Sequence, residues 1–380
     1  MKFQVNKDVL SEAVSFSVKL LPVRTALPIL SGVLIEATGD SVTFSTFDYE
    51  ASSKTTVTAT VDQPGRVLVP GRLLNDIAGR LPQAPVTLEL TDTKVLVTCG
   101  SSRFSLPCMP VDEYPTIPTV EGSTGVVPGE EFAAAVSQVV VAASREDSMP
   151  VINGVQLEIS GTALSMMATD RYRVAIKDVP WDAGSSPVEH AALVPARTMQ
   201  EIGKTLGSSP TISITLATKD DREVIAFHAD NKTVTSLLIK GTFPPVRRLF
   251  PETIENFAVV NTADLIEATR RVKLVVEREA ALKYIFRDNT ITLEAVGGDQ
   301  AQASETIDAV ITGLELTVSL KPDLLLDGLS AVHSEFTRLG FNNGDNPSKP
   351  GPVLITSHTS KEGSADSTYR YLLQPNLLLR

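Results

Sequence analysis

The polar residues of this sequence that recur at matching positions are arginines. Arg72 and Arg197 each lie two residues after a proline that separates two apolar runs, and Arg24 and Arg145 lie in corresponding loops. A guanidinium group is always charged and suits phosphate or carboxylate recognition. A single arginine of this kind could simply be a solvent-exposed helix residue or pair with a carboxylate. The shared register favours a binding role instead.

Motifs for catalysis or cofactor binding are absent from the sequence. There is no G-x-x-x-x-G-K-[ST] loop and no G-x-G-x-x-G after an expected strand. The four histidines are isolated from one another and from Cys at metal-ligand spacing, and Asp220 and Asp221 are typical of a solvated turn. An enzymatic alternative would use Asp170, Arg171 and Arg173 as acid and base-orienting residues, but no nucleophile accompanies them. We therefore expect no catalysis, no metal and no cofactor.

One strand–proline–helix pattern occurs three times along the chain. It reads VLVPGRLLNDIAGRL at 67–81, LVPARTMQEIGKTL at 193–206 and VSLKPDLLLDGLSAV at 318–332. Proline ends a strand and has a backbone suited to the first helical position. The prolines are 125 and 127 residues apart (195 − 70 and 322 − 195). A repeat of this length is a domain and not a solenoid unit.

Apolar residues follow each proline at helical spacing. At 4, 7 and 11 residues after the proline, the first copy has Leu74, Ile77 and Leu81, and the second has Met199, Ile202 and Leu206. The third copy has Leu326 and Leu329 at the first two positions and Val332 one residue before the third. An earlier helix is expected in each third, at 7–21, 130–143 and 263–276, with Asn6 and Asn261 as N-caps. Alternating segments such as TISITLAT predict half-buried antiparallel strands.

These patterns predict an α+β protein of three similar domains, each with two helices packed on antiparallel sheets. We place the domains at 1–120, 126–251 and 252–380, because Pro- and Gly-rich stretches at 114–129 and 243–255 are typical of linkers. The segment NNGDNPSKPGP, at 342–352, is expected to be a loop inserted in the third domain.

The composition is that of a globular protein with net charge −11, from 34 basic and 45 acidic residues. This argues against a dense basic surface but permits one locally basic face. No apolar run approaches the roughly 20 residues that span a membrane. The start, MKFQVNKDVL, lacks the apolar centre of a signal peptide, so we expect a cytoplasmic protein. Cys99 and Cys108 are expected to be free thiols.

Helices that face inward from three repeated domains could line a ring. Twelve helices about 10 Å wide, from two chains, would leave a hole of about 28 Å, whereas six would leave only about 9 Å. A DNA duplex is roughly 20 Å across. One chain cannot surround it, but a head-to-tail pair can, and closure leaves no unpaired end. Such a ring needs positive charge only on its inner wall.

The sequence resembles the bacterial DNA polymerase III β subunit, the sliding-clamp family, along its whole length. The resemblance rests on RTALPIL at 24–30, VPGRLLNDIAGRLP at 69–82, SRFSLPCMPVDEYP at 102–115, ATDRYRVA at 168–175 and GTFPPVRRLFP at 241–251. It implies a homodimeric ring that surrounds double-stranded DNA, is loaded by an ATP-driven clamp loader and tethers DNA polymerase III through its alpha subunit. It implies no catalysis.

The resemblance also implies roles for individual residues. Arg24 and Arg72 match family DNA contacts, and the repeat adds Arg145 and Arg197. The family's aromatic DNA contacts are replaced by Pro150 and Val151. Dimer contacts are implied at Phe104 on one subunit and at Leu274 and Val275 on the other.

A peptide-binding pocket for polymerase, loader and repair proteins is implied between the second and third domains. Its members by motif match or terminal position are Ile152, Thr169, Arg171, Tyr172, Arg173, Val174, Pro244, Arg248, Leu249, Leu372, Gln374, Pro375, Asn376 and Leu377. The apolar members would bury the anchors of a peptide and the arginines would orient its polar groups. Without the family resemblance, Ile152 and Val174 could equally be residues of the hydrophobic core.

The C-terminus departs from the family pattern Met-Pro-Met/Val-Arg-Leu. It reads Gln374, Pro375, Asn376 and then three leucines before Arg380. Methionine is a flexible apolar wall that adapts to different peptides, so its replacement by Gln374 predicts an altered pocket. Three interpretations stay open beside the general clamp: a specialised second clamp that escapes a pocket-directed inhibitor, the enzyme considered above, and a peptide-binding scaffold without DNA.

Overall fold

The computed structural model describes residues 1–22, 25–120, 122–146, 148–184, 189–219, 222–277, 280–296, 301–342 and 351–376. These residues belong to two compact units. Unit 1 contains Met1–Ala133, Trp181–Pro187 and Arg197–Leu238; unit 2 contains Ala134–Pro180, Val188–Ala196 and Ile239–Arg380. The expected turn at Asp220 and Asp221 and most of the expected loop at 342–352 lie outside the described residues.

Unit 1 contains two antiparallel sheets. The first has the order β5-β1-β7-β8-β9, with β1 at Lys2–Val5, β5 at Thr60–Gln63, β7 at Val86–Thr91, β8 at Lys94–Cys99 and β9 at Ser102–Pro107. The second has the order β10-β15-β16-β17-β4-β3-β2-β6. Its strands are β2 (Gly32–Thr38), β3 (Ser41–Phe47), β4 (Ala51–Thr58), β6 (Gly65–Pro70), β10 (Gly125–Pro128), β15 (Thr211–Lys219), β16 (Arg222–Ala229) and β17 (Lys232–Leu237).

Unit 2 contains one antiparallel sheet with the order β14-β11-β12-β13-β25-β24-β23-β18-β21-β20-β19-β22. Its strands are β11 (Gly154–Ser160), β12 (Ala163–Thr169), β13 (Arg173–Pro180), β14 (His190–Pro195), β18 (Asn256–Asn261), β19 (Leu282–Arg287), β20 (Thr290–Val296), β21 (Gln302–Thr312), β22 (Leu316–Leu320), β23 (Phe336–Phe341), β24 (Val353–His358) and β25 (Ala365–Leu373). In both units, strands from distant parts of the sequence pair: β4 with β17, and β13 with β25.

Six α-helices accompany the described strands, so the predicted α+β class is confirmed. They are α1 (Lys7–Val18), α2 (Gly71–Ala78), α3 (Gly129–Val140), α4 (Ala196–Leu206), α5 (Thr262–Val272) and α6 (Pro322–Ser330). Asn6 and Asn261 are N-caps as predicted, since their side chains accept hydrogen bonds from the N–H groups of Asp8 and Asp264. The earlier helix of each third ends about one turn before its predicted end.

One residue of the apolar stripe predicted after the third proline is wrong, whereas Leu329 and Val332 are buried as predicted. Leu325 and Leu329 are buried, whereas Leu326, which we expected in the core, is only half-buried. The reason is the helix start: α6 begins on Pro322 itself, whereas α2 and α4 begin one residue after their prolines. Counted from the first helical residue, Leu74, Met199 and Leu325 occupy the same position.

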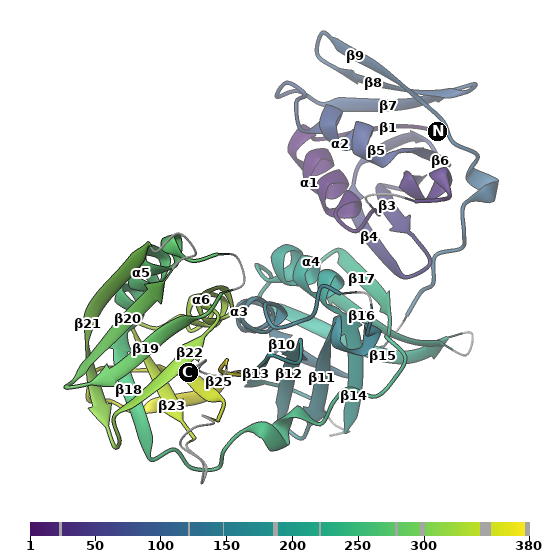
Figure 1. Cartoon of the computed structure of the whole chain (residues 1–380). Helices are drawn as coiled ribbons and strands as arrows, with labels where there is room; N and C mark the ends of the chain where they lie inside the picture. Colours follow the sequence, from purple (N-terminus) through teal and green to yellow (C-terminus); the bar gives the residue numbers. More distant parts are fainter. Residues whose placement is uncertain are drawn as a thin grey trace. The chain divides into compact units, whose positions relative to one another are not determined.

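The core of the first third lies between its two sheets. Phe3 and Leu88 come from the five-stranded sheet, Ile35 and Phe44 from the eight-stranded sheet, and Leu10, Val14 and Leu74 from α1 and α2. The two helices lie side by side (Figure 1) and contact each other as well as the strands. Most of their apolar residues are buried on the side of these contacts, whereas the charged residues Asp8, Glu12 and Arg72 are exposed.

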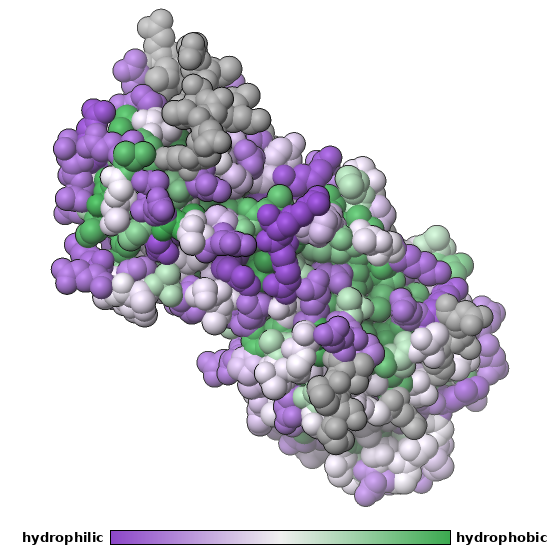
Figure 2. Space-filling view, turned by 90° about the horizontal axis from the view of Figure 1, so that it is seen from below, coloured by the Kyte–Doolittle hydropathy of each residue, from purple (hydrophilic) through white to green (hydrophobic). Residues whose placement is uncertain are grey.

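The surface and the cysteines are consistent with a globular protein. Figure 2 shows a face on which apolar areas are interrupted by hydrophilic residues. Cys99 is buried, Cys108 is half-buried, and both are free thiols as predicted. None of the helices in the described part of the chain is long and apolar enough to cross a membrane.

Replacing Leu74 should test the packing of α2. We expect Leu74→Ala to lower the free energy of unfolding by about 3 kcal/mol, because it leaves a cavity in a closed core. The matched control is Leu73→Ala, since Leu73 is the preceding residue of the same helix and is 45% exposed. Urea unfolding followed by circular dichroism measures both. Equal effects of the two substitutions would contradict the assigned helix face.

Candidate functional site

The repeated arginines lie on the surface at equivalent helix positions. Arg72 is the second residue of α2 and Arg197 the second residue of α4, and both side chains are exposed. An Nη of Arg72 donates a hydrogen bond to the Pro22 carbonyl at 3.1 Å. Arg145, which follows α3, is also exposed, whereas Arg24 lies outside the described residues. The described arginines are thus free to meet a large anionic partner.

The ATDRYRVA motif forms a tight turn between β12 and β13. One oxygen of Asp170 accepts hydrogen bonds from the backbone N–H groups of Tyr172 and Arg173, at 3.0 and 3.1 Å. Arg171 has a positive φ of 80°, which is uncommon for a residue other than glycine. The Thr169 hydroxyl donates to the Arg173 carbonyl at 2.7 Å. Asp170 therefore holds the turn, which does not favour its proposed role as a catalytic acid.

Arg173 is a buried cation at the start of β13. Its side chain is only 7% exposed and forms ion pairs with Asp170, at 2.9 Å, and with Asp327 of α6, at 2.6 Å. Burial acts to lower the pKa of Arg173, but Tyr371, Asp327 and Asp170 outweigh it and hold this pKa above its usual value. Arg173 is therefore occupied by partners within unit 2, whereas Arg171 is exposed and forms an ion pair with Glu146, at 3.3 Å.

Tyr371 of β25 completes this polar cluster. Its hydroxyl lies 3.2 Å from a guanidinium nitrogen of Arg173 and donates a hydrogen bond to the Leu324 carbonyl at 2.7 Å. Burial raises the pKa of Tyr371, so the phenol stays neutral. Gly328 of α6 makes this contact possible, since a Cβ there would lie 2.5 Å from the Tyr371 ring. The turn, β25 and α6 are thus fixed together.

An apolar cluster lies beside the turn. Val174 and Leu372 pair across β13 and β25 and pack with Met167, Ile176 and Val246; Phe243, Phe250 and Leu354 are partly buried against them. The family resemblance pointed to Val174 and Leu372 but missed the others. The sequence signal for the others was the group of apolar residues Phe243, Val246 and Phe250 in FPPVRRLF. Apolar side chains in a linker are expected to pack against a neighbouring apolar surface.

The pocket residues that the family resemblance implies differ in their exposure to solvent. Ile152, Thr169, Val174, Leu372 and Pro375 are buried, and Pro244 and Asn376 are half-buried. Arg171, Tyr172, Arg248, Leu249 and Gln374 are exposed. Lys321 lies over the Tyr172 ring, 5.5 Å from its centroid, and the Asn376 N–H donates to the Ser319 carbonyl at 2.8 Å. Leu377 lies outside the described residues. Tyr172 and Leu249 are therefore the apolar members that a ligand can reach directly.

The implied dimer contacts are apolar residues, of which Phe104 and Leu274 are exposed. Phe104 lies on β9, an edge strand of the five-stranded sheet. Leu274 is 80% exposed and Val275 half-buried in the 3₁₀ helix Lys273–Val275 that follows α5. No group of three or more His, Cys, Asp or Glu side chains within the described residues is arranged to hold a metal ion.

Comparison with known proteins gives three successive family matches. Residues 1–118 match the N-terminal domain, residues 126–245 the central domain and residues 247–358 the C-terminal domain of the DNA polymerase III beta subunit. The beta sliding clamp of Streptomyces coelicolor is 39% identical over 376 residues, which are 99% of each chain. The beta sliding clamp homolog GriR of Streptomyces muensis is 38% identical over 375 residues, again 99% of each chain.

Solved structures agree with these matches. The DNA polymerase sliding clamp from Bacillus subtilis is similar with a TM-score of 0.89 and 26% identity, over 100% of both chains. The chain therefore belongs to the DNA polymerase III beta subunit family, and its fold consists of three DNA clamp domains.

Asp327→Asn should loosen the turn at 170–172. We expect a loss of about 1.5 kcal/mol in the free energy of unfolding, at the lower end for a hydrogen bond to a charged group, because Asp327 is 43% exposed. The amide hydrogens of Tyr172 and Arg173 should also exchange faster with solvent. Asp323→Asn, on the same helix and in an exposed pair with Lys273, is the control and should leave these amides unchanged. Unchanged exchange in Asp327→Asn would contradict the described coupling.

Proposed function

We propose that this member of the DNA polymerase III beta subunit family is a sliding clamp. Two chains would close head to tail into a ring around duplex DNA and tether the DNA polymerase III alpha subunit. The observation that carries the proposal is the succession of three beta-subunit domain matches along one chain, together with equivalent exposed arginines on α2 and α4. We propose domain limits of 1–120, 126–251 and 252–380, which lie close to the matched ranges.

We propose that the DNA contacts are Arg24, Arg72, Arg145 and Arg197. Arg72 and Arg197 support this because they share a register and because both side chains are exposed. The net charge of −11 is compatible with DNA binding when positive charge is confined to the inner wall. Contacts to phosphates alone carry no sequence information, which suits a protein that slides along any DNA sequence.

We propose that the dimer contacts are Phe104 on one subunit and Leu274 and Val275 on the other. An edge strand presents unpaired backbone groups that favour pairing with another chain, and β9 is such a strand. The exposure of Leu274 supports the assignment, because burying a leucine side chain contributes roughly 1.5–3 kcal/mol.

We propose that partner peptides bind beside the turn at 170–172. Tyr172 and Leu249 offer apolar contact area, and Arg171 and Arg248 offer charged hydrogen-bond donors around the buried cluster of Val174 and Leu372. The proposed ligands are segments of the polymerase, of a clamp loader and of other replication and repair proteins. Arg173 acts in this proposal by holding the turn and not by touching the peptide.

A specialised second clamp is the alternative that one observation favours. Gln374 is exposed next to the proposed peptide site, where the family resemblance implies methionine. An amide gives less apolar contact than a thioether and must keep its own hydrogen bonds. Such a clamp would bind ordinary peptides or a pocket-directed inhibitor more weakly.

The proposed ring is tested by comparing its retention on circular and on linear DNA. With a clamp loader and ATP, the protein should stay on nicked circular DNA and should leave when that DNA is cut once, because a ring slides off free ends. Leu274→Asp should weaken the dimer by about a hundredfold or more, since it places a charge in an apolar contact, and should lose retention. Leu314→Asp is the control, because Leu314 is also an exposed leucine of unit 2 (65%). A wild-type chain that is monomeric at micromolar concentration would contradict the ring.

The C-terminal departure is tested by restoring methionine. We expect Gln374→Met to bind a generic clamp-binding peptide about three- to tenfold more tightly, because the thioether adds apolar contact. Gln302→Met, at an exposed position of β21, controls for added hydrophobicity. Equal dissociation constants for the wild type and Gln374→Met would remove the specialised clamp from consideration.

A further inference from the structure

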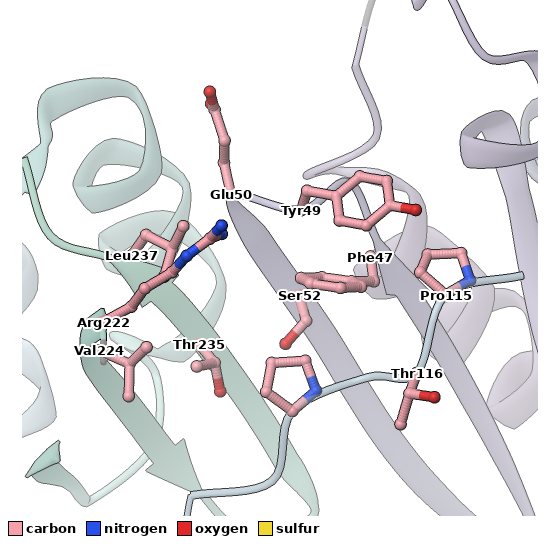
Figure 3. Close-up of a pocket in the computed structure, with 11 residues that line it drawn as sticks. Phe47, Tyr49, Glu50, Ser52, Pro115, Thr116, Arg222, Val224, Thr235 and Leu237 are labelled. Atoms are coloured by element: carbon pink, nitrogen blue, oxygen red, sulfur yellow. The ribbon is translucent and has the colours of Figure 1, made fainter. Parts of the chain in front are cut away.

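A cavity of about 330 Å³ lies in unit 1, where β4 pairs with β17 (Figure 3). The segment that follows Tyr114 covers it, and we call it the linker pocket. Its apolar wall consists of Phe47, Tyr49, Pro115, Pro118, Val224 and Leu237. The volume is at the lower end of the range for small-ligand sites, so it suits one or two side chains and not a large cofactor.

The turn beside the linker pocket has the same construction as the turn at 170–172. One oxygen of Asp48 accepts hydrogen bonds from the N–H groups of Glu50 and Ala51, at 3.0 and 2.7 Å. Tyr49, like Arg171, has a positive φ, of 71°. The Leu237 N–H donates to the Glu50 carbonyl, as the Gln374 N–H donates to the Tyr172 carbonyl. The two places are therefore equivalent in the repeat.

Side-chain size explains why unit 1 has a cavity at this place. The pair Val174 and Leu372 of unit 2 is buried in an apolar cluster. The equivalent pair in unit 1 is Ser52 and Thr235, which face each other across β4 and β17 and line the cavity. The smaller side chains leave space that the larger pair of unit 2 occupies.

The roof of the linker pocket is fixed by Tyr114. Its hydroxyl accepts a hydrogen bond from the Phe47 N–H at 2.7 Å and donates to the Phe47 carbonyl at 3.4 Å. Burial raises the pKa of Tyr114 to about 12, so the phenol is neutral at physiological pH. The segment that starts at Pro115 is thus held over the strands without a ligand, and a preformed site loses less entropy on binding.

Charge at the linker pocket favours an anionic group. Arg222 and Glu50 are the charged residues of the lining, and in Figure 3 the guanidinium group of Arg222 points toward the strand that carries Ser52, whereas the Glu50 side chain extends away from Ser52. Arg222 forms no ion pair with any residue that the structure describes. Arg66 in the same unit, by contrast, pairs with Asp112 at 3.0 Å. A carboxylate is the natural partner of such an arginine.

A second cavity, of about 470 Å³, adjoins the linker pocket along the same segment. The two share Ser52, Pro115, Thr116, Pro118 and Thr235. The second cavity is also lined by Lys54, which is likewise without an ion pair among the described residues. Successive cavities along one strand suit an extended chain, whose side chains recur every few ångströms.

We propose that the linker pocket binds an aromatic or leucyl side chain of a short extended peptide, with a neighbouring carboxylate of that peptide facing Arg222. The apolar wall accepts the side chain, Arg222 orients the acid, and the adjoining cavity takes the next residues. The inference uses contacts of unit 1 alone. It therefore does not depend on peptide binding near Tyr172.

The test uses methyl NMR of the full chain with labelled leucine and valine. The probe is N-acetyl-Leu-Phe with a free C-terminal carboxylate, compared with its C-terminal amide. We expect saturable shifts of the Val224 and Leu237 methyl signals with a dissociation constant in the millimolar range, about two- to fivefold lower for the acid than for the amide. Signals of Leu249 and Leu372 report separately on the proposed site in unit 2.

Two variants decide the assignment. Ser52→Leu should fill the linker pocket and abolish the Val224 and Leu237 shifts, whereas Thr58→Leu, at an exposed position of the same strand, should keep them. Arg222→Gln, at an exposed position, should make the acid and the amide bind equally, whereas Arg80→Gln, at another exposed position of unit 1, should not.

Several outcomes would overturn the linker pocket. Absence of saturable shifts at Val224 and Leu237 would do so, whether or not Leu249 and Leu372 respond. Shifts that persist in Ser52→Leu, or an acid preference that persists in Arg222→Gln, would do the same. Shifts at Leu249 and Leu372 alone would leave the proposed peptide site of unit 2 standing and remove only the linker pocket.

Discussion

An aspartate that accepts two backbone N–H bonds precedes β4 in unit 1 and β13 in unit 2, and much of the structure depends on this turn. The turn sets the register in which each strand pairs with a strand far away in sequence, β17 or β25. A one-residue slip would exchange the buried and exposed faces of the strand. Successive thirds of the chain are therefore joined by backbone hydrogen bonds whose position a short local motif fixes.

Local features of the fold were predictable from the sequence because they depend on neighbouring residues. The caps at Asn6 and Asn261 and the strand–proline–helix repeats are of this kind. The first position of the third stripe was wrong, because α6 begins on its proline whereas α2 and α4 begin one residue later. Leu326 and Leu325 differ by one position, and only the folded chain shows which is buried.

Contacts between distant residues were not predictable in the same way. We expected Arg173 to orient a ligand, and nothing in the sequence indicated that Asp327 and Tyr371, far away along the chain, would bind its guanidinium group. The ATDRYRVA motif gives no sign of which of its two arginines will be exposed. The cavity beside Ser52 was likewise hidden, because it arises from small residues on two strands whose pairing no sequence pattern reveals.

Repetition explains how one architecture supports different surfaces. The backbone of the turn is conserved between the two units, including the positive φ of Tyr49 and Arg171, because the strand pairing requires it. The paired side chains next to it face a weaker constraint: Val174 and Leu372 fill their site, whereas Ser52 and Thr235 leave theirs open. The volume of the side chains at these two paired positions thus decides whether the site beside the turn is filled or contains a cavity. The surrounding backbone hydrogen bonds are the same in both cases.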